Sequence, residues 1–322
     1  METNKLAPPE KPTETAACVK NKPHELEQSR VEGVSIVIPA YNEEKGAPPV
    51  MKETLELLRR ELEGKIEFEV IVVDDGSTDG TTEALRPFEK EASFRVVRHS
   101  KNRGYGAAIK TGIRYAKHDW IMITDADGTY PAEHIPEILN AREADSMVVG
   151  ARIGANAQIP WIRRPPKWVL RKLAELLSGN EIPDLNSGLR VFQKDVATRF
   201  RSILPNQFSY TTTITLAMFA AGYDVKYLPI NYRKREGLSK IRPIADTLNF
   251  LKLIIRTILF FDPLRVFLPI SVFFMLGSVG VGVGSYVITG KLMDVTTVLL
   301  MITGIQMLML GMIADTMNRR MS

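Results

Sequence analysis

Two long runs without a charged residue, 266–288 and 295–314, constrain this 322-residue chain more than any other feature. Each holds about the 20 residues that a helix needs to cross the hydrocarbon core of a bilayer. The segment 289–294 between them is short, so the second run has to return to the side from which the first departs. The pattern predicts a transmembrane hairpin, and the alternative is a pair of buried helices in a soluble core.

Positive charges are unevenly placed around these runs. Arg256, Arg265, Arg319 and Arg320 flank the outer ends, whereas Lys291 is the one basic residue between the runs. The positive-inside rule therefore predicts that both termini and the rest of the chain are cytoplasmic, with 315–322 as a short cytoplasmic tail. No apolar run opens the chain, so we expect no signal peptide.

Composition excludes several classes of protein. The excess of 42 Lys and Arg over 37 Asp and Glu is small for this length, so we expect no nucleic-acid partner. A single cysteine, Cys18, allows neither an internal disulfide nor a cysteine-based zinc site. Residues 1–30 are polar, rich in proline and without hydrophobic period, which predicts a disordered tail.

Residues 31–240 have the pattern of one α/β domain. Short apolar runs at 35–38, 68–73, 95–97 and 120–123 alternate with helical stretches. Strands that are apolar on both faces indicate a mostly parallel sheet covered by helices on both sides. In such sheets ligands bind beyond the carboxyl ends of the strands, so the chemistry is expected in the segments that follow them.

Three of these segments carry carboxylates, at 39–44, 74–80 and 125–128. Carboxylates gathered on one edge repel each other unless a cation lies between them. Oxygen ligands without His or Cys suit Mg²⁺ or Mn²⁺, with substrate phosphates completing the coordination. The alternative for Asp125 and Asp127 is a turn or helix cap, and the turn alternative also stays open for Asp74, Asp75 and Asp79.

Several short motifs occur in an order that resembles that of a known enzyme family. They are VIPAYNE at 37–43, VDDGS at 73–77, NRGYG at 102–106, DAD at 125–127, DLNSGLR at 184–190 and REGLSK at 235–240. This succession resembles the family-two inverting glycosyltransferases, whose catalytic domain has the GT-A (nucleotide-diphospho-sugar transferase) fold. It is most similar to the polyprenyl-phosphate glycosyltransferases, the group that includes the dolichyl-phosphate mannose synthases.

The resemblance implies roles for individual residues on the donor side. Asp125 and Asp127 would hold the metal against the donor diphosphate, and Thr129 stands where the mannose synthases have a glutamine, so the third protein ligand stays open. A basic loop would close over the phosphates, or alternatively touch anionic lipid. The donor-side residues are Pro39, Tyr41, Glu43 and Asp75 in the nucleotide pocket and Arg235, Ser239 and Lys240 in the basic loop.

On the acceptor side, the resemblance assigns Arg152 and Arg171 to the lipid phosphate. Asp184 would be a base or an orienting carboxylate, unless it only caps the turn that follows it. The catalytic set is then Asp184, Asp127, Arg235 and Lys240. The implied reaction transfers a hexose, first of all mannose, from GDP-mannose or a UDP-hexose to dolichyl or undecaprenyl phosphate with inversion.

Residues 241–265 connect this domain to the hairpin. Their polar positions recur at spacings of three and four, which predicts an amphipathic helix in the headgroup plane, with core packing as the alternative. A lipid-linked phosphate could then reach the strand ends. The sequence leaves the oligomeric state open, a homo-oligomer included.

Proteins of other functional classes would show different sequence motifs. A dinucleotide fold would need a third glycine after Gly104 and Gly106, where Ile109 stands, so we exclude it. Small residues at 104–108 fit close packing as well as phosphate contact. A processive polysaccharide synthase would show a Gln-x-x-Arg-Trp motif and more spans, which this sequence lacks. A membrane-tethered nucleotide-sugar sensor without enzymatic activity remains an alternative.

Overall fold

The computed structural model describes residues 33–153, 172, 174–175, 179–207, 209–233, 255, 259–260, 262–290 and 295–321, without the side chains of 289 and 318–321. Contacts divide the chain into two units, 1–31 and 32–322, and all described residues belong to the second. The expected tail 1–30, Arg171, the basic loop 235–240 and most of the expected amphipathic helix 241–265 lie outside the described residues.

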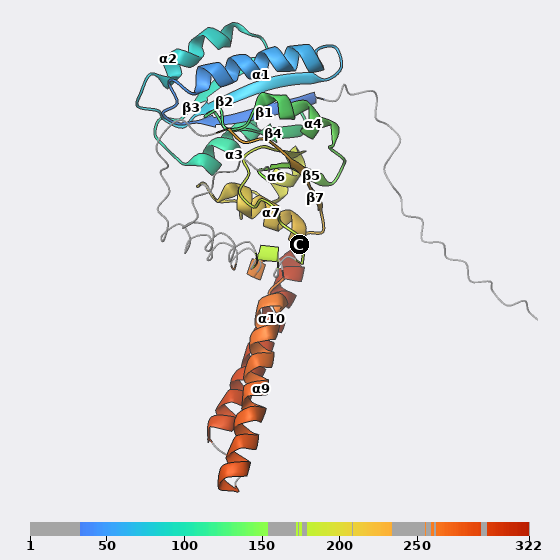
Figure 1. The fold of residues 1–322 in the computed structure, drawn as a ribbon. Helices are drawn as coiled ribbons and strands as arrows, with labels where there is room; N and C mark the ends of the chain where they lie inside the picture. Colours follow the sequence, from blue (N-terminus) through green and yellow to red (C-terminus); the bar gives the residue numbers. More distant parts are fainter. Residues whose placement is uncertain are drawn as a thin grey trace, which may run out of the picture. The chain divides into compact units, whose positions relative to one another are not determined.

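A seven-stranded sheet forms the centre of the described domain (Figure 1). Its order is β3-β2-β1-β4-β6-β5-β7. Only β6, among these strands, runs antiparallel to its neighbours β4 and β5. The strands are β1 Gly33–Ala40, β2 Glu67–Asp74, β3 Phe94–Arg98, β4 Trp120–Ile123, β5 Ser146–Ala151, β6 Arg190–Gln193 and β7 Asp224–Pro229. The predicted α/β class with a mostly parallel sheet is confirmed, and each predicted strand lies within an observed one.

Helices cover both faces of the sheet because its central strands are apolar on both sides. Every residue of β1 is buried. Ile36 and Ile38 join one core cluster with α1, while Val37 joins a second with α3 and α7. The helices are α1 Ala47–Leu62, α2 Thr81–Leu85, α3 Tyr105–Tyr115, α4 Ile135–Asn140, α6 Lys194–Arg199 and α7 Tyr210–Ala220, with 3-10 turns at Arg86–Lys90 and Ala132–His134.

The direction of the antiparallel strand β6 determines which segments lie at the edge of the sheet where the parallel strands end. The carboxyl ends of β1, β2, β4, β5 and β7 lie at one edge of the sheet. Since β6 runs the other way, its amino end lies at that same edge. The segment 184–189 that leads into β6 is thereby brought to the loops that follow the parallel strands.

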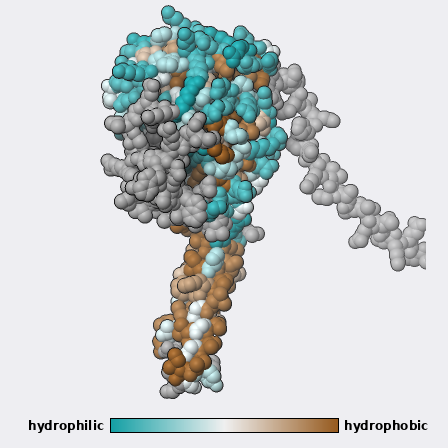
Figure 2. Space-filling model, in the orientation of Figure 1, coloured by the Kyte–Doolittle hydropathy of each residue, from teal (hydrophilic) through white to brown (hydrophobic). Residues whose placement is uncertain are grey.

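Two long helices, α9 Leu264–Thr289 and α10 Val295–Met321, form the C-terminal hairpin. Both are long and apolar enough to cross a membrane, and only 17% and 11% of their most apolar stretches are buried, which argues against core helices of a soluble domain. Figure 2 shows their largely hydrophobic surface. Ser271 and Ser278 of α9 donate hydrogen bonds to the carbonyls of Gly304 and Thr297 of α10, both at 2.8 Å. The segment expected as a tail, 315–322, is helical through Met321.

Candidate active site

The loops after β1 and β2 are joined into one surface by hydrogen bonds. Asn42, in a left-handed backbone conformation (φ 55°), donates its N–H to the hydroxyl of Ser77 and accepts one from the N–H of Thr78, at 3.0 and 2.9 Å. Tyr41 and Glu43 beside it are half-buried. Two residues expected in the nucleotide pocket therefore lie on a loop whose backbone is held in place by the next loop.

Asp74 and Asp79 stabilise the turn itself. Asp74 is fully buried and accepts hydrogen bonds from the N–H of Ser77 and the hydroxyl of Thr82. Burial alone would raise the pKa of Asp79, but hydrogen bonds from Thr81 and Glu44 outweigh it and lower that pKa. These contacts support the turn interpretation for both residues.

Asp75 is buried and holds the segment that follows β3. Its carboxylate accepts the N–H groups of Arg103 and Gly104 at 2.9 and 2.7 Å, and its Oδ1 lies 2.6 Å from Nδ1 of His99. His99 in turn contacts the hydroxyl of Thr111 at 2.9 Å. Both oxygens of Asp75 thus have protein partners, and its expected place in the nucleotide pocket stays a prediction.

Asp125 and Asp127 follow β4 and are half-buried. The hydroxyl of Tyr105 donates to Oδ1 of Asp125 at 2.9 Å, and the hydroxyl of Thr129 donates to Oδ1 of Asp127 at 2.6 Å. Burial, and next the charge of Asp125, raises the pKa of Tyr105, so the phenol remains a donor at neutral pH. Thr129, which stands where the mannose synthases have a glutamine, therefore contacts the carboxylate of Asp127.

The side-chain oxygens available here suit a divalent ion that takes most of its ligands from a substrate. Within the described residues, no group of three or more His, Cys, Asp or Glu side chains is arranged to hold a metal ion. Two carboxylates without His or Cys fit Mg²⁺ or Mn²⁺, which typically combine one or two protein carboxylates with substrate phosphates and water. Asp125 and Asp127 are the residues that fit this pattern.

The glycines at 104 and 106 allow close packing. Gly104 has φ 102°, and a Cβ there would overlap the backbone carbonyl of Asn206, whereas a Cβ on Gly106 would overlap that of Pro205. The N–H of Ala107 donates to the carbonyl of Asn206 at 3.0 Å. These contacts favour the packing interpretation of this motif and place Tyr105 beside Asp125.

The segment leading into β6 lies directly against Asp125. A Cβ on Gly188 would come within 2.7 Å of Oδ2 of Asp125. The N–H of Gly188 donates to the hydroxyl of Tyr130 at 2.7 Å, and the hydroxyl of Ser187 donates to the carbonyl of Gly150 at 2.5 Å. Only a residue without a side chain fits here while the carboxylate keeps its position.

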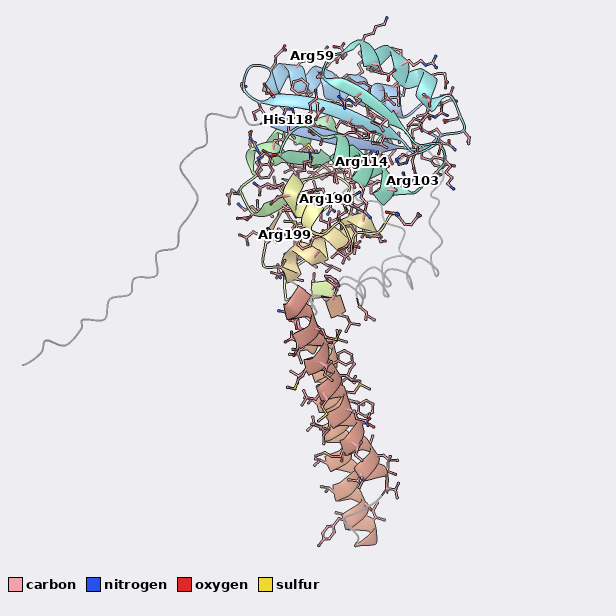
Figure 3. The ribbon with its side chains drawn as sticks, turned by 180° about the vertical axis from the view of Figure 1, so that it is seen from behind. Arg59, Arg103, Arg114, His118, Arg190 and Arg199 are labelled. Atoms are coloured by element: carbon pink, nitrogen blue, oxygen red, sulfur yellow. The ribbon has the colours of Figure 1, made fainter. Side chains whose placement is uncertain are left out.

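Arg190 supports this segment from inside the domain, where Figure 3 labels it. Its side chain is fully buried and donates to the carbonyls of Ser187 and Thr211 and to the hydroxyl of Thr215. Burial lowers its pKa. The DLNSGLR motif thus ends in a structural cation that fixes the backbone just before β6.

Arg152 and Asp184, expected on the acceptor side, bind each other. Nε of Arg152 lies 2.6 Å from Oδ2 of Asp184, and Nη2 lies 2.8 Å from Oδ1. The guanidinium also lies over the ring of Tyr232, at 5.3 Å from its centroid. Burial alone would raise the pKa of Asp184, but the hydrogen bonds and charge of Arg152 outweigh it, so that pKa is lowered and the carboxylate is ionised at neutral pH.

The sequence motifs bring part of the expected site together. The donor-side residues Pro39, Tyr41, Glu43, Asp75, Asp125 and Asp127 lie on β1 or in the loops that follow β1, β2 and β4, and the pair Arg152–Asp184 lies at the same edge. Four expected residues, Arg171, Arg235, Ser239 and Lys240, lie outside the described residues.

Several contact residues were missed by the sequence interpretation. They are His99, Tyr105, Tyr130 and Tyr232. Tyr105 lies inside the NRGYG motif and Tyr130 three residues beyond the DAD motif, so aromatic residues next to charged motifs were an available signal. His99 and Tyr232 had no local signal, because their partners are distant in sequence.

A mostly parallel sheet with paired carboxylates beyond its central strand ends defines a GT-A-like domain of the nucleotide-sugar transferase type. Residues 35–200 match glycosyl transferase family 2, and the chain belongs to this family. Residues 262–319 match the GtrB C-terminal hairpin. The resemblance seen in the motifs is confirmed by both matches.

Curated relatives are similar to part of this chain. The chain is 32% identical over 193 residues to the undecaprenyl-phosphate 4-deoxy-4-formamido-L-arabinose transferase of Edwardsiella ictaluri, covering 56% of this chain and 58% of that protein. It is 28% identical over 214 residues to the dolichyl-phosphate hexose transferase of Haloferax volcanii, covering 66% and 88%. The chain thus spans less than two thirds of the arabinose transferase it matches.

Solved structures share the fold. Glucosyl-3-phosphoglycerate synthase from Mycobacterium tuberculosis, in complex with Mn²⁺, uridine diphosphate and phosphoglyceric acid, superimposes with a TM-score of 0.55 at 18% identity, covering 70% of this chain and 78% of that one. At this identity the likeness shows the fold alone, and that fold accommodates a divalent ion in the synthase.

Proposed function

We propose that this protein transfers a sugar from a nucleoside-diphosphate sugar to a polyprenyl phosphate at a membrane, with inversion at the anomeric carbon. The observation that carries the proposal is a family 2 domain followed, in one chain, by a hairpin of two long apolar helices. The hairpin supplies a reason for a lipid acceptor, and the named relatives act on undecaprenyl and dolichyl phosphates.

The donor side would consist of the loops after β1, β2 and β4. Asp125 and Asp127 would hold Mg²⁺ or Mn²⁺, which when bound neutralises the diphosphate as it leaves. Tyr41, Glu43 and Asp75 would lie along the nucleotide. Asp125 and Asp127 accept hydrogen bonds from the hydroxyls of Tyr105 and Thr129.

On the acceptor side, Arg152 would bind the lipid phosphate. Its ion pair with Asp184 uses the Nε and Nη2 edge of the guanidinium, so a phosphate would be bound through Nη1. The pair as a whole is neutral, and net positive charge for the phosphates would come from Arg171, Arg235 and Lys240.

The bond changes are simple. A phosphate monoester is already mostly ionised near neutral pH. One of its oxygens would attack the anomeric carbon while the bond from that carbon to the diphosphate oxygen breaks, and the electron pair would leave with the nucleoside diphosphate. Since little deprotonation is needed, we propose that Asp184 orients Arg152 instead of acting as a base.

The two groups of relatives are named for different sugars. The Haloferax relative, of which the chain covers 88%, is named a hexose transferase, whereas the bacterial relatives are named 4-deoxy-4-formamido-L-arabinose transferases. We propose a hexose, with mannose from GDP-mannose first and glucose or another UDP-hexose second.

The test is transfer of labelled sugar into a lipid fraction by the full-length protein in detergent or lipid. Undecaprenyl and dolichyl phosphates would be offered with GDP-mannose, UDP-glucose and Mn²⁺. We expect one donor to label the lipid, and the Asp127→Ala variant or EDTA to abolish most labelling, while Asp224→Ala, at an exposed position, keeps it. Donor binding without any lipid labelling would instead support the sensor.

A further inference from the structure

The two carboxylates proposed as metal ligands share one feature: each accepts a hydroxyl hydrogen bond on Oδ1. Tyr105 donates to Asp125 at 2.9 Å and Thr129 donates to Asp127 at 2.6 Å. Tyr105 lies on α3, beyond β3, whereas Thr129 lies in the same loop as the carboxylates. The two donors therefore reach the site from independent parts of the fold.

The position of Tyr105 is determined by backbone packing. Tyr105 is the first residue of α3, and the glycines on both sides of it lie against the backbone of Pro205 and Asn206. The bond from the N–H of Ala107 to the carbonyl of Asn206, at 3.0 Å, fixes the same turn. The phenol is thus presented by a helix start that has little room to shift.

Thr129 is held from both sides. It is 1% exposed, and its N–H and hydroxyl both donate to Oδ1 of Asp127, at 3.1 and 2.6 Å. Its carbonyl accepts the N–H of Arg233 at 2.9 Å. A valine here would keep the shape and the backbone bonds, and would remove only the hydroxyl.

We propose that Tyr105 and Thr129 are positioning residues that preset the planes of Asp125 and Asp127 for a divalent ion. This rests on the metal site of the proposed function. A carboxylate turns easily about its last side-chain torsion. A donor fixed on one oxygen therefore determines where the remaining lone pairs point.

A hydrogen bond to a metal-binding carboxylate also has an opposing effect. A hydrogen bond withdraws electron density from a carboxylate and by itself weakens its hold on a cation. Loss of hydrogen-bonding partners behind metal ligands nevertheless typically lowers metal affinity or activity by about 10- to 100-fold. Orientation is therefore the larger effect, and removing either hydroxyl should weaken metal binding.

The test measures Mn²⁺ binding to the full-length protein by the electron paramagnetic resonance signal of free Mn²⁺, with UDP or GDP present. We expect Tyr105→Phe and Thr129→Val each to weaken Mn²⁺ binding by about 10- to 100-fold. Thr129→Ser keeps a hydroxyl and should restore most of the affinity.

Two control variants match these changes. Tyr115→Phe removes a tyrosine hydroxyl from the same helix at a position that is 42% exposed. Thr213→Val removes the hydroxyl of a threonine that is 1% exposed and donates to the carbonyl of Ser209 at 2.9 Å. Both should bind Mn²⁺ as the unmodified protein does, with the thermal midpoint of each variant measured alongside.

Unchanged Mn²⁺ affinity in both Tyr105→Phe and Thr129→Val would overturn the inference, as would a lower thermal midpoint with unchanged affinity. An unmodified protein that binds no Mn²⁺ with either nucleotide would also overturn it. If Mn²⁺ binding responds as expected but no polyprenyl phosphate is glycosylated, the inference stands and the proposed function fails.

Discussion

Arg152 and Asp184 form a two-point ion pair, with Nε to Oδ2 at 2.6 Å and Nη2 to Oδ1 at 2.8 Å. The two side chains are 24% and 11% exposed, so the pair is shielded from much of the solvent. The N–H of Asn186 also donates to Asp184, at 3.2 Å. An arginine held in this way cannot turn freely, and the edge it presents to a ligand is determined before the ligand binds.

Replacing Arg152 tests its proposed role toward the lipid phosphate. Arg152→Ala removes a charge-assisted contact of roughly 1.5–3 kcal/mol, so lipid-dependent turnover should fall about ten- to hundredfold. Donor affinity, measured by calorimetry, should barely change, and Arg171→Ala should behave alike. Collapse of donor binding with unchanged lipid dependence would show that the acceptor assignment is wrong.

A double-mutant cycle separates an orienting Asp184 from a base. If Asp184 acts through Arg152, then Asp184→Asn should lower turnover in the unmodified protein and have little further effect in Arg152→Ala. A base would be needed in both backgrounds, so equal losses in the two would contradict the orienting role. Turnover with saturating donor is the quantity to compare.

The pair should also be visible in the pH dependence of stability. The pKa of Asp184 is lowered in the folded protein, so the stabilisation is complete above the unfolded value near 4 and is lost as the pH falls through the folded pKa. The difference in thermal midpoint between the unmodified protein and Asp184→Asn should be constant around pH 6–7 and shrink below about pH 4. A difference that grows with acidification would refute this.

Gly188 offers a test of the contact between the two halves of the site. An alanine Cβ would come within 2.7 Å of Oδ2 of Asp125, so Gly188→Ala should displace that carboxylate and weaken Mn²⁺-dependent donor binding. Gly284→Ala is the control, since nothing lies within 4 Å of the Cβ it would add. Equal donor affinity in Gly188→Ala and the unmodified protein would count against the placement.

Topology can be decided by cysteine labelling of intact cells. With Cys18 replaced by serine, Lys291→Cys should react with an impermeant thiol reagent from outside, because the loop 289–294 is predicted to be exposed on the outer side of the membrane. Ser322→Cys should stay unlabelled until the cells are opened. The reverse pattern would overturn the cytoplasmic placement of the catalytic domain and both termini.

Local sequence patterns were sufficient for the four predicted strands and for the hairpin. β1, β2, β3 and β4 were visible because each is a short apolar run between polar loops, and α9 and α10 because charge is absent over a membrane-spanning length. The carboxylates of Asp125 and Asp127 were located in the same way, since a residue that follows a parallel strand lies at the functional edge.

Only the tertiary structure decided which of these residues touch. The reversed direction of β6 brings the segment 184–188 to the edge where Asp125 and Arg152 lie, and no local pattern encodes the direction of a four-residue strand. The pair Arg152–Asp184 and the bond from Tyr105 to Asp125 join residues 32 and 20 positions apart. Local periodicity reflects burial alone, whereas such contacts depend on how separate loops pack, so the sequence determined the elements and the packing determined the site.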